Sequence, residues 1–262
     1  GTGPSTTICQ GQCANLSASV VPVNQTTSYS VTTIPYAPFS FTNGTSIIAN
    51  QDDIWSSVLN LGFPFCYYGN TFTQGVVGSN GQLTFSLGVA NQTNGWSITT
   101  PIPSLVDMPG NTICAAFRDI DPTSSGNIYF ATYGTAPCRS FVISWNNVPM
   151  FSNPGSCSGI PNSTFQLVLH ETSNYIDVFI QNSTACPGWN SGRGIIGVQN
   201  VNGTLATFPP GRNSPAQWTA INEAWRFVPT GPQSYTVNWA GPSGNVGTGL
   251  TANVCPATTT NY

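Results

Sequence analysis

The stretch from Ser163 to Asn182 reads STFQLVLHETSNYIDVFIQN, and its two halves, 164–170 and 175–181, alternate apolar and polar residues around a polar turn. Period-2 alternation is typical of strands that bury one face, so this stretch predicts an antiparallel hairpin. No stretch combines a 3.6-residue period with helix caps. The sequence therefore predicts an all-β chain folded as an antiparallel sandwich. Similar short runs separated by turn residues occur at 75–77, 82–86, 127–133, 140–145 and 194–199.

The turn of this hairpin fixes which residues face each other. With 173–174 as a two-residue turn, Leu169 lies opposite Val178 on the apolar face. In the same register His170 lies opposite Asp177 on the more polar face. A histidine facing an aspartate on such a face predicts a solvated cross-strand pair in preference to a catalytic base.

Charged side chains are rare in this chain. Only 5% of the 262 residues are charged, with five basic residues, all arginine, eight acidic residues and one histidine. A net charge of -3 without a basic run gives little with which to neutralise phosphates, so nucleic acid and anionic membranes are poor partners. No apolar stretch approaches the roughly 18 residues that a membrane span needs, so we expect no membrane insertion. Gly1 opens no signal-peptide pattern, which is typical of a mature or trimmed chain.

The chain contains eight cysteines that are dispersed and form no C-x-x-C pair. The single histidine lies far from any cysteine cluster, which gives a zinc site little support. An even number of dispersed cysteines in a chain poor in charge predicts disulfides in an oxidising, extracellular environment. Connectivity does not follow from spacing alone, because eight cysteines allow about 105 pairings. The cysteines are Cys9, Cys13, Cys66, Cys114, Cys138, Cys157, Cys186 and Cys255.

The two ends of the chain differ in composition from the middle. Residues 1–27 and 230–262 are rich in Thr, Val, Gly and other small residues, whereas residues 28–229 are richer in aromatic residues. This pattern predicts one small β domain, built from both ends, that is interrupted by a larger inserted domain.

The middle segment resembles a known extracellular family. LGFPFCYYGNTFTQGVVGSNGQLTFS, at residues 61–86, has an aromatic-rich strand, Tyr-Gly, a spacer and Ser-Asn-Gly before the next strand. The blocks AAFRDIDPTSSGNIYFATYG, RSFVISWNNVPMF, STFQLVLHETSNYIDVFIQN and GIIGVQNVNGT follow in family order. Together they cover roughly residues 55–205 and resemble nidogen-like domains.

The flanks resemble a second family. ICQGQCANLSAS and VNWAGPSGNVGTGLTANVCPATTTNY are similar to strands of immunoglobulin-like repeats in large Bacteroidota surface adhesins. The whole pattern resembles the amino-terminal region of gliding-motility adhesins that are exported by the type IX route. This resemblance implies a nidogen-like β-sandwich inserted into, or packed on, an immunoglobulin-like β-sandwich, located at the cell surface. It also implies that further repeats follow Tyr262.

One disulfide pairing follows from this resemblance. In a split immunoglobulin-like domain the first and last strands meet, which places Cys13 or Cys9 near Cys255. Cys13 is preferred, because its Gly-Gln-Cys context departs from the usual repeat, as does Val-Cys-Pro at Cys255. The second expected pair is Cys138 with Cys157, which flank one hairpin.

The densest acidic cluster is a candidate calcium site. RDIDPTSSGN contains Asp119 and Asp121, and hard cations bind clustered carboxylate and carbonyl oxygens of tight loops. The spacing fails the EF-hand pattern, because Ser124 stands where glycine is required and no acid closes the loop at Phe130. The alternative is an ordinary turn that Asp121 begins.

Other acidic residues give little support for an enzyme. Asp52 and Asp53 could act as glycosidase carboxylates with Asp119 or Glu171, but nothing in the sequence brings them together, which favours a cap or turn. No G-x-S-x-G elbow or P-loop is present, and His170 is the only histidine available as a base. We therefore expect a protein that is not an enzyme.

Aromatic residues are the remaining candidates for a binding site. Trp145 alternates with apolar residues and is expected in the core, whereas Trp96 and Trp189 lie in the polar segments NQTNGWS and CPGWNSGRG. Aromatic faces can stack on sugars or form hot spots in protein contacts. The resemblance implies a non-enzymatic adhesin head that contacts surfaces, glycans or proteins and meets the type IX export machinery. Two alternatives stay open: a dedicated carbohydrate-binding module, and a structural or assembly domain.

Overall fold

The computed structural model describes residues 7–9, 12–20, 23–48, 50–233 and 235–261. The chain forms two compact units. The larger unit comprises residues 25–231, and the smaller unit combines residues 1–24 with residues 232–262. The described residues form β-strands and two short 3-10 helices, η1 (Leu87–Val89) and η2 (Asn190–Gly192). The all-β prediction is confirmed.

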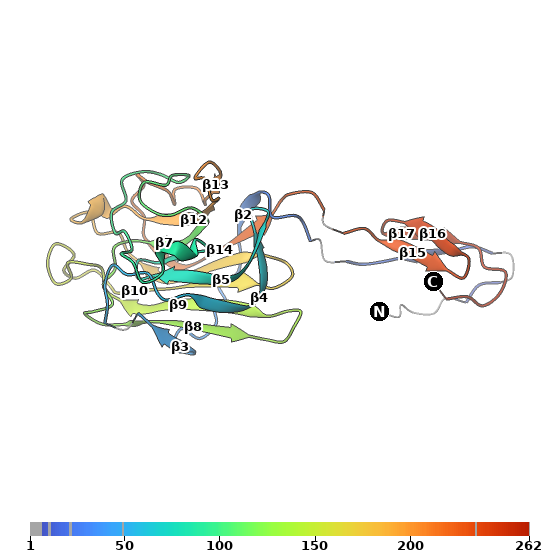
Figure 1. The fold of residues 1–262 in the computed structure, drawn as a ribbon, viewed down its shortest axis with the longest axis horizontal. Helices are drawn as coiled ribbons and strands as arrows, with labels where there is room; N and C mark the ends of the chain where they lie inside the picture. Colours follow the sequence, from blue (N-terminus) through green and yellow to red (C-terminus); the bar gives the residue numbers. More distant parts are fainter. Residues whose placement is uncertain (1–6, 10–11, 21–22, 49, 234, 262) are drawn as a thin grey trace. The chain divides into compact units, whose positions relative to one another are not determined.

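The first layer of the larger unit is a seven-stranded antiparallel sheet. Its strands appear side by side in Figure 1, and the hairpin predicted at residues 163–182 lies at its centre as β10 (Ser163–His170) and β11 (Ile176–Ser183). The order across the sheet is β2 (Tyr29–Thr33), β14 (Ala220–Pro229), β11 (Ile176–Ser183), β10 (Ser163–His170), β9 (Ser140–Val148), β8 (Asn127–Tyr133) and β3 (Thr45–Ile47).

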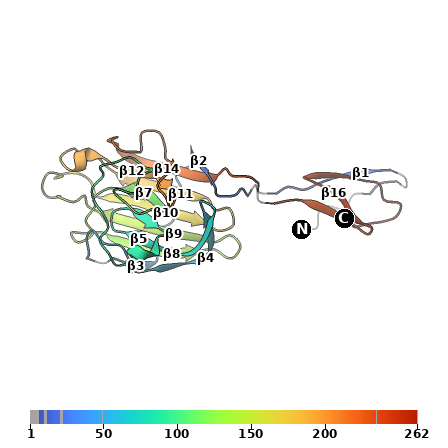
Figure 2. The ribbon, with the colours of Figure 1, turned by 45° about the horizontal axis from the view of Figure 1, so that its top comes forward.

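The second layer is a six-stranded antiparallel sheet that packs on the first, as the turned view in Figure 2 shows. Three of its strands come largely from residues 61–86, the segment whose Ser-Asn-Gly motif carried the nidogen resemblance. The order is β13 (Ala206–Thr207), β12 (Ile195–Gln199), β7 (Thr112–Phe117), β6 (Gln82–Thr84), β5 (Asn70–Gly78) and β4 (Leu59–Tyr67).

The core of the larger unit lies between the two sheets. β4 buries every second residue, which is the period-2 pattern of a strand with one face in the core. From the opposite sheet, the fully buried rings of Trp145 and Phe165 stack at 5.0 Å between centroids. Burial of side chains of this size contributes roughly 1.5–3 kcal/mol each, so the buried aromatic residues of the two sheets contribute strongly to the stability of the sandwich.

The β10–β11 hairpin has a different register from the expected one. Leu167, and not Leu169, lies opposite Val178, and Val168 lies opposite Asp177. The predicted two-residue turn is wrong. The His170 N–H donates to the Tyr175 oxygen, so the ladder extends to these two residues and a four-residue loop, 171–174, joins the strands. The shift is two residues, and since side chains alternate with period 2, each residue keeps the predicted face.

The described residues of the smaller unit form two two-stranded antiparallel sheets. One pairs β1 (Ala14–Ser17) with β17 (Thr251–Val254), and the other pairs β15 (Asn238–Gly241) with β16 (Gly244–Thr248). A disulfide joins Cys13 to Cys255 beside the first pair, as the split domain implied. The assignment of the smaller unit as an immunoglobulin-like domain stays a prediction.

The second expected disulfide is wrong. Cys157 is bonded to Cys186, with their Cα atoms 5.6 Å apart, whereas Cys138 is exposed and has no disulfide partner. Both bonded cysteines lie in loops at the same end of the sandwich. Cys138 lies in the turn between β8 and β9, at the opposite end of β9 from Cys157. The predicted pairing was wrong because two cysteines that flank the same strand lie at its opposite ends.

Candidate functional site

Loops between strands bring together acidic side chains that are distant in sequence. Asp52 and Asp53 lie between β3 and β4, and Asp119 follows β7. One carboxylate oxygen of each residue lies within 4.8 Å of the others. Asp119 is only 3% exposed, and its Oδ2 accepts a hydrogen bond of 2.7 Å from Nε1 of Trp189. The three aspartates form what we call the acidic cluster.

The Ser79-Asn80-Gly81 motif holds the acidic cluster together. The buried Asn80 side chain donates to Oδ1 of Asp53 at 2.9 Å and accepts from the Ile120 N–H at 3.0 Å. It thus ties the loop of Asp53 to the chain directly after Asp119. Ser79 adds a backbone hydrogen bond of 3.0 Å to the Ile54 oxygen. The sequence identified this motif only as a part of the nidogen resemblance and did not predict its role in holding the acidic cluster.

Glycine is required at the third position of that motif. Gly81 has a φ of +85°, which side chains other than glycine rarely adopt. A Cβ there would lie 2.7 Å from the backbone oxygen of Ala116. The tight turn of Gly81 therefore lets the chain approach β7, the strand that ends just before Asp119.

Burial sets the electrostatics of the acidic cluster. Burial raises the pKa of Asp119 to about 7, opposed by the Trp189 hydrogen bond and assisted by the charges of Asp53 and Asp52. Burial, with the charges of Asp53 and Asp121, raises the pKa of Asp52 to about 6. The pKa of Asp53 is raised as well, chiefly by burial. Three carboxylates that resist ionisation together can hold protons or a cation.

The predicted partnership of Asp119 with Asp121 is not what the structure forms. Both oxygens of Asp121 accept hydrogen bonds from its own turn, Oδ1 from the Thr123 N–H at 2.8 Å and Oδ2 from the Ser124 hydroxyl at 3.0 Å. Asp121 therefore acts as a turn starter, the alternative reading of RDIDPTSSGN. Asp52 and Asp53 lie beside Asp119 in the structure, an arrangement that nothing in the sequence indicated.

Aromatic side chains cover one side of the acidic cluster. Trp189 packs between Trp96, with ring centroids 5.8 Å apart, and Phe151, at 4.9 Å. Trp96 is 41% exposed and Phe151 36% exposed, and the amide of Asn190 donates to the Trp96 backbone oxygen at 3.0 Å. We call Trp96, Phe151 and Trp189 the aromatic cluster. The sequence predicted both tryptophans separately, and the structure brings them into contact.

The Cys157–Cys186 disulfide braces the loops of the aromatic cluster. Cys157 lies six residues after Phe151 and donates its N–H to the Ser152 oxygen at 3.0 Å. Cys186 lies three residues before Trp189 and accepts its N–H at 3.0 Å. The bond therefore links the two aromatic rings through short, hydrogen-bonded segments, which limits how far they can separate.

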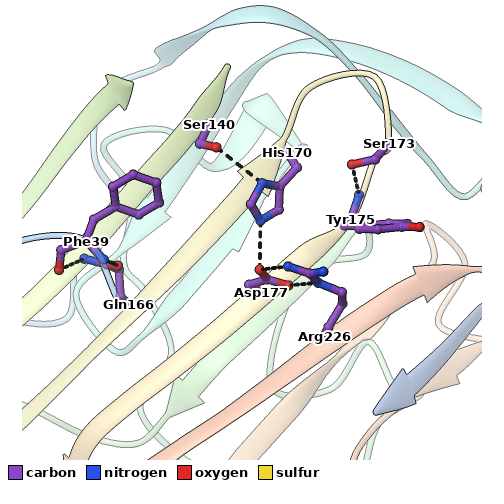
Figure 3. Close-up of polar contacts among 8 residues, drawn as sticks. All are labelled: Phe39, Ser140, Gln166, His170, Ser173, Tyr175, Asp177 and Arg226. Carbon is purple, nitrogen blue, oxygen red and sulfur yellow. Dashed lines mark hydrogen bonds and ion pairs between the residues drawn. The ribbon is translucent and has the colours of Figure 1, made fainter. Parts of the chain in front are cut away.

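His170 lies in a second polar group, on the outer face of the seven-stranded sheet (Figure 3). Its Nε2 contacts Oδ2 of Asp177 at 2.8 Å, and its Nδ1 contacts the Ser140 hydroxyl at 3.3 Å. Arg226 donates to both oxygens of Asp177, each at 2.7 Å. The contact between His170 and Asp177 was expected, although it is diagonal across the strands and not directly opposite.

This group has the order of a serine, histidine and aspartate triad but lacks its surroundings. A triad serine is exposed on a sharp turn beside N–H groups that can stabilise an oxyanion. Ser140 is buried and pairs with Tyr133 and His170 inside the β ladder. Its hydroxyl is therefore held within the β ladder and not on an exposed turn, and hydrogen bonds join the group into one network.

Comparisons with known proteins identify one family. The NIDO-related family model matches residues 28–238. No curated protein and no solved structure matches the chain. No helix among the described residues is long and apolar enough to cross a membrane. The family and the two disulfides indicate an extracellular protein. Since the match covers most of the 262 residues and includes both sheets of the sandwich, this chain belongs to the NIDO-related family.

Proposed function

We propose that this protein is the non-enzymatic head region of an extracellular adhesin, which acts in attachment or gliding motility by contacting surfaces, glycans or proteins. The aromatic cluster carries the proposal. Trp96 and Phe151 are exposed large aromatic side chains on loops, and they pack on the same ring, Trp189. Tryptophan and other aromatic residues are strongly represented among binding hot spots, because they bury large areas at little entropic cost.

The low charge of the chain supports a contact of this kind. With 5% charged residues, long-range electrostatic steering is weak, and binding depends on aromatic, amide and backbone groups at short range. Such a contact is expected to vary little with ionic strength. That property suits a surface protein that works in variable salt.

The absence of catalysis is part of the proposal. His170 is tied to Asp177, which Arg226 holds on both oxygens. Asp119 lies buried against Trp189 and is not positioned to reach a substrate in solution. The groups with acid–base potential are thus engaged in the structure of the sandwich and its loops.

A dedicated carbohydrate-binding module is the second candidate. The tilted pair of Trp96 and Trp189, with the Asn190 amide beside it, combines ring faces with a polar group that can hydrogen bond hydroxyls.

Cell-surface location, gliding motility and contact with the type IX export machinery are proposed from the resemblance of the flanks to adhesin repeats.

Binding of the purified chain to natural substrata and to a glycan array tests the proposal. Trp96→Ala should weaken binding by about tenfold or more, which corresponds to about 1.4 kcal/mol, more than the roughly 1 kcal/mol that most interface residues cost when truncated. Ile221→Ala is the matched control, because Ile221 is a 69% exposed apolar residue on β14. Loss in Trp96→Ala on substrata without any glycan hit supports the adhesin over the carbohydrate module. Equal binding by wild type and Trp96→Ala would contradict the contact role of the aromatic cluster.

A further inference from the structure

The acidic cluster has no positive partner among the residues that the structure describes. Among the described residues, ion pairs join Arg139 to Glu171, Arg212 to Glu223, and both Arg226 and His170 to Asp177, all of them outside the acidic cluster. Asp52, Asp53 and Asp119 take part in none of them, although their oxygens lie within 4.8 Å of one another. Like charges at this distance in a half-buried site repel each other strongly unless something neutralises them.

One oxygen of the cluster is buried and unused. Oδ2 of Asp119 accepts the Trp189 hydrogen bond, but Oδ1 has no hydrogen-bond partner, and the residue is 97% buried. A buried charged acceptor without a partner is unfavourable, because it has lost its hydration and gains no hydrogen bond in return. An orphaned acceptor beside two further carboxylates is the arrangement that a bound cation resolves.

We propose that Asp52, Asp53 and Asp119 bind a calcium ion. Calcium prefers oxygen ligands and tolerates irregular geometry, which suits carboxylates supplied by separate loops, and water can complete its coordination. Asp52 and Asp53 are only partly buried, so an ion can enter from their side. Magnesium is disfavoured, because it requires near-ideal octahedral geometry and keeps most of its water.

The ion would also order the aromatic cluster. Trp189 donates directly to Asp119, and the Phe151 N–H donates to the Asp119 backbone oxygen at 3.0 Å. A cation that fixes the Asp119 carboxylate therefore fixes one hydrogen bond of Trp189, next to a backbone bond that positions Phe151. The cation site goes beyond the proposed contact function and is testable without any surface or glycan.

Titration of the purified chain with the metal alone tests the inference. Calorimetry with Ca²⁺ should give one saturable site with a Kd near or below about 10⁻³ M, the range of extracellular calcium modules. Tb³⁺ bound at the same site should luminesce when tryptophan is excited, because Trp189 contacts a ligand residue, and Ca²⁺ should compete it away. Trp189→Phe should reduce this luminescence while calorimetric Ca²⁺ binding persists.

Variants distinguish a bound cation from the alternative, in which protons shared by the three carboxylates neutralise the acidic cluster. Asp53→Asn should weaken Ca²⁺ binding at least tenfold and remove the rise in Tm that Ca²⁺ produces. Asp107→Asn is the control and should bind as wild type, because Asp107 accepts hydrogen bonds from Thr99 and Thr100 in another loop. The inference is overturned if wild type shows no saturable binding, if folded Asp53→Asn binds as wild type, or if Asp53→Asn raises Tm while Ca²⁺ has no effect on either protein.

Discussion

The disulfide between Cys157 and Cys186 is the contact on which the geometry of the aromatic cluster most depends. The two cysteines are 29 residues apart in sequence. In the chain-entropy model, closing a loop of that length removes about 12 cal/mol/K from the unfolded ensemble, or about 3.6 kcal/mol at 25 °C. We expect Cys157→Ala with Cys186→Ala to lower the free energy of unfolding by roughly this amount.

Thermal unfolding followed by tryptophan fluorescence measures the loss. Of the seven tryptophans, only Trp239 lies outside the larger unit, so the signal reports mainly on residues 25–231. For a domain of this size, 1 kcal/mol shifts Tm by about 2–4 °C, so the double variant should melt roughly 7–14 °C lower. The control, Cys138→Ala, removes an exposed free thiol and should change stability by less than about 0.5 kcal/mol.

A stabilising role of the Cys157–Cys186 bond is refuted if Cys138→Ala melts as low as the double variant, or if the double variant loses less than about 1 kcal/mol of unfolding free energy. A tryptic digest without reduction gives an independent check, because the chain has no lysine and cleavage follows arginine only. Cys157 and Cys186 both lie between Arg139 and Arg193, so their bond joins no two peptides. A cross-link between the peptides of Cys138 and Cys157 would refute the pairing.

The remaining predictions concern the sheet face and a close backbone approach. Burial would raise the pKa of Asp177, but hydrogen bonds from Arg226 and His170 outweigh it and hold that pKa below its ordinary value. The group therefore adds stability above the unfolded-state pKa that is lost as pH falls through the lower folded value, and Asp177→Asn should flatten this acid limb in urea unfolding. An acid limb as steep as wild type would contradict this. Gly110→Ala should destabilise by about 1–3 kcal/mol, because its Cβ would lie 1.9 Å from a backbone oxygen, whereas Gly88→Ala, with open space around it, should stay near neutral in the same assay; equal melting of the two would refute it.

The sequence predicted the sandwich because the alternation of apolar and polar residues is a local property of each strand. Alternation along residues 163–182 assigns each side chain to a face, and a register error of two residues left that assignment intact. His170 therefore met Asp177 even though the predicted turn was wrong. The exact register required knowledge of the four-residue loop, in which Asn174 adopts a φ of 53° that propensity alone does not predict.

Contacts between distant loops were beyond the reach of the sequence. Asp52 and Asp119 are 67 positions apart, and hydrogen bonds from Ser79 and from the buried Asn80 side chain hold their two loops together. The Cys157–Cys186 bond has the same origin, because which loops share an end of the sandwich depends on strand order.

By itself, the sequence determined the all-β class, the extracellular character and the family motif, since alternation, cysteine content and short motifs are properties of neighbouring residues. Only the tertiary structure decided the composition of the acidic cluster and the meeting of Trp96 with Trp189. The physical reason is that these groups lie on loops, whose positions in space depend on the packing of two whole sheets and not on any local pattern.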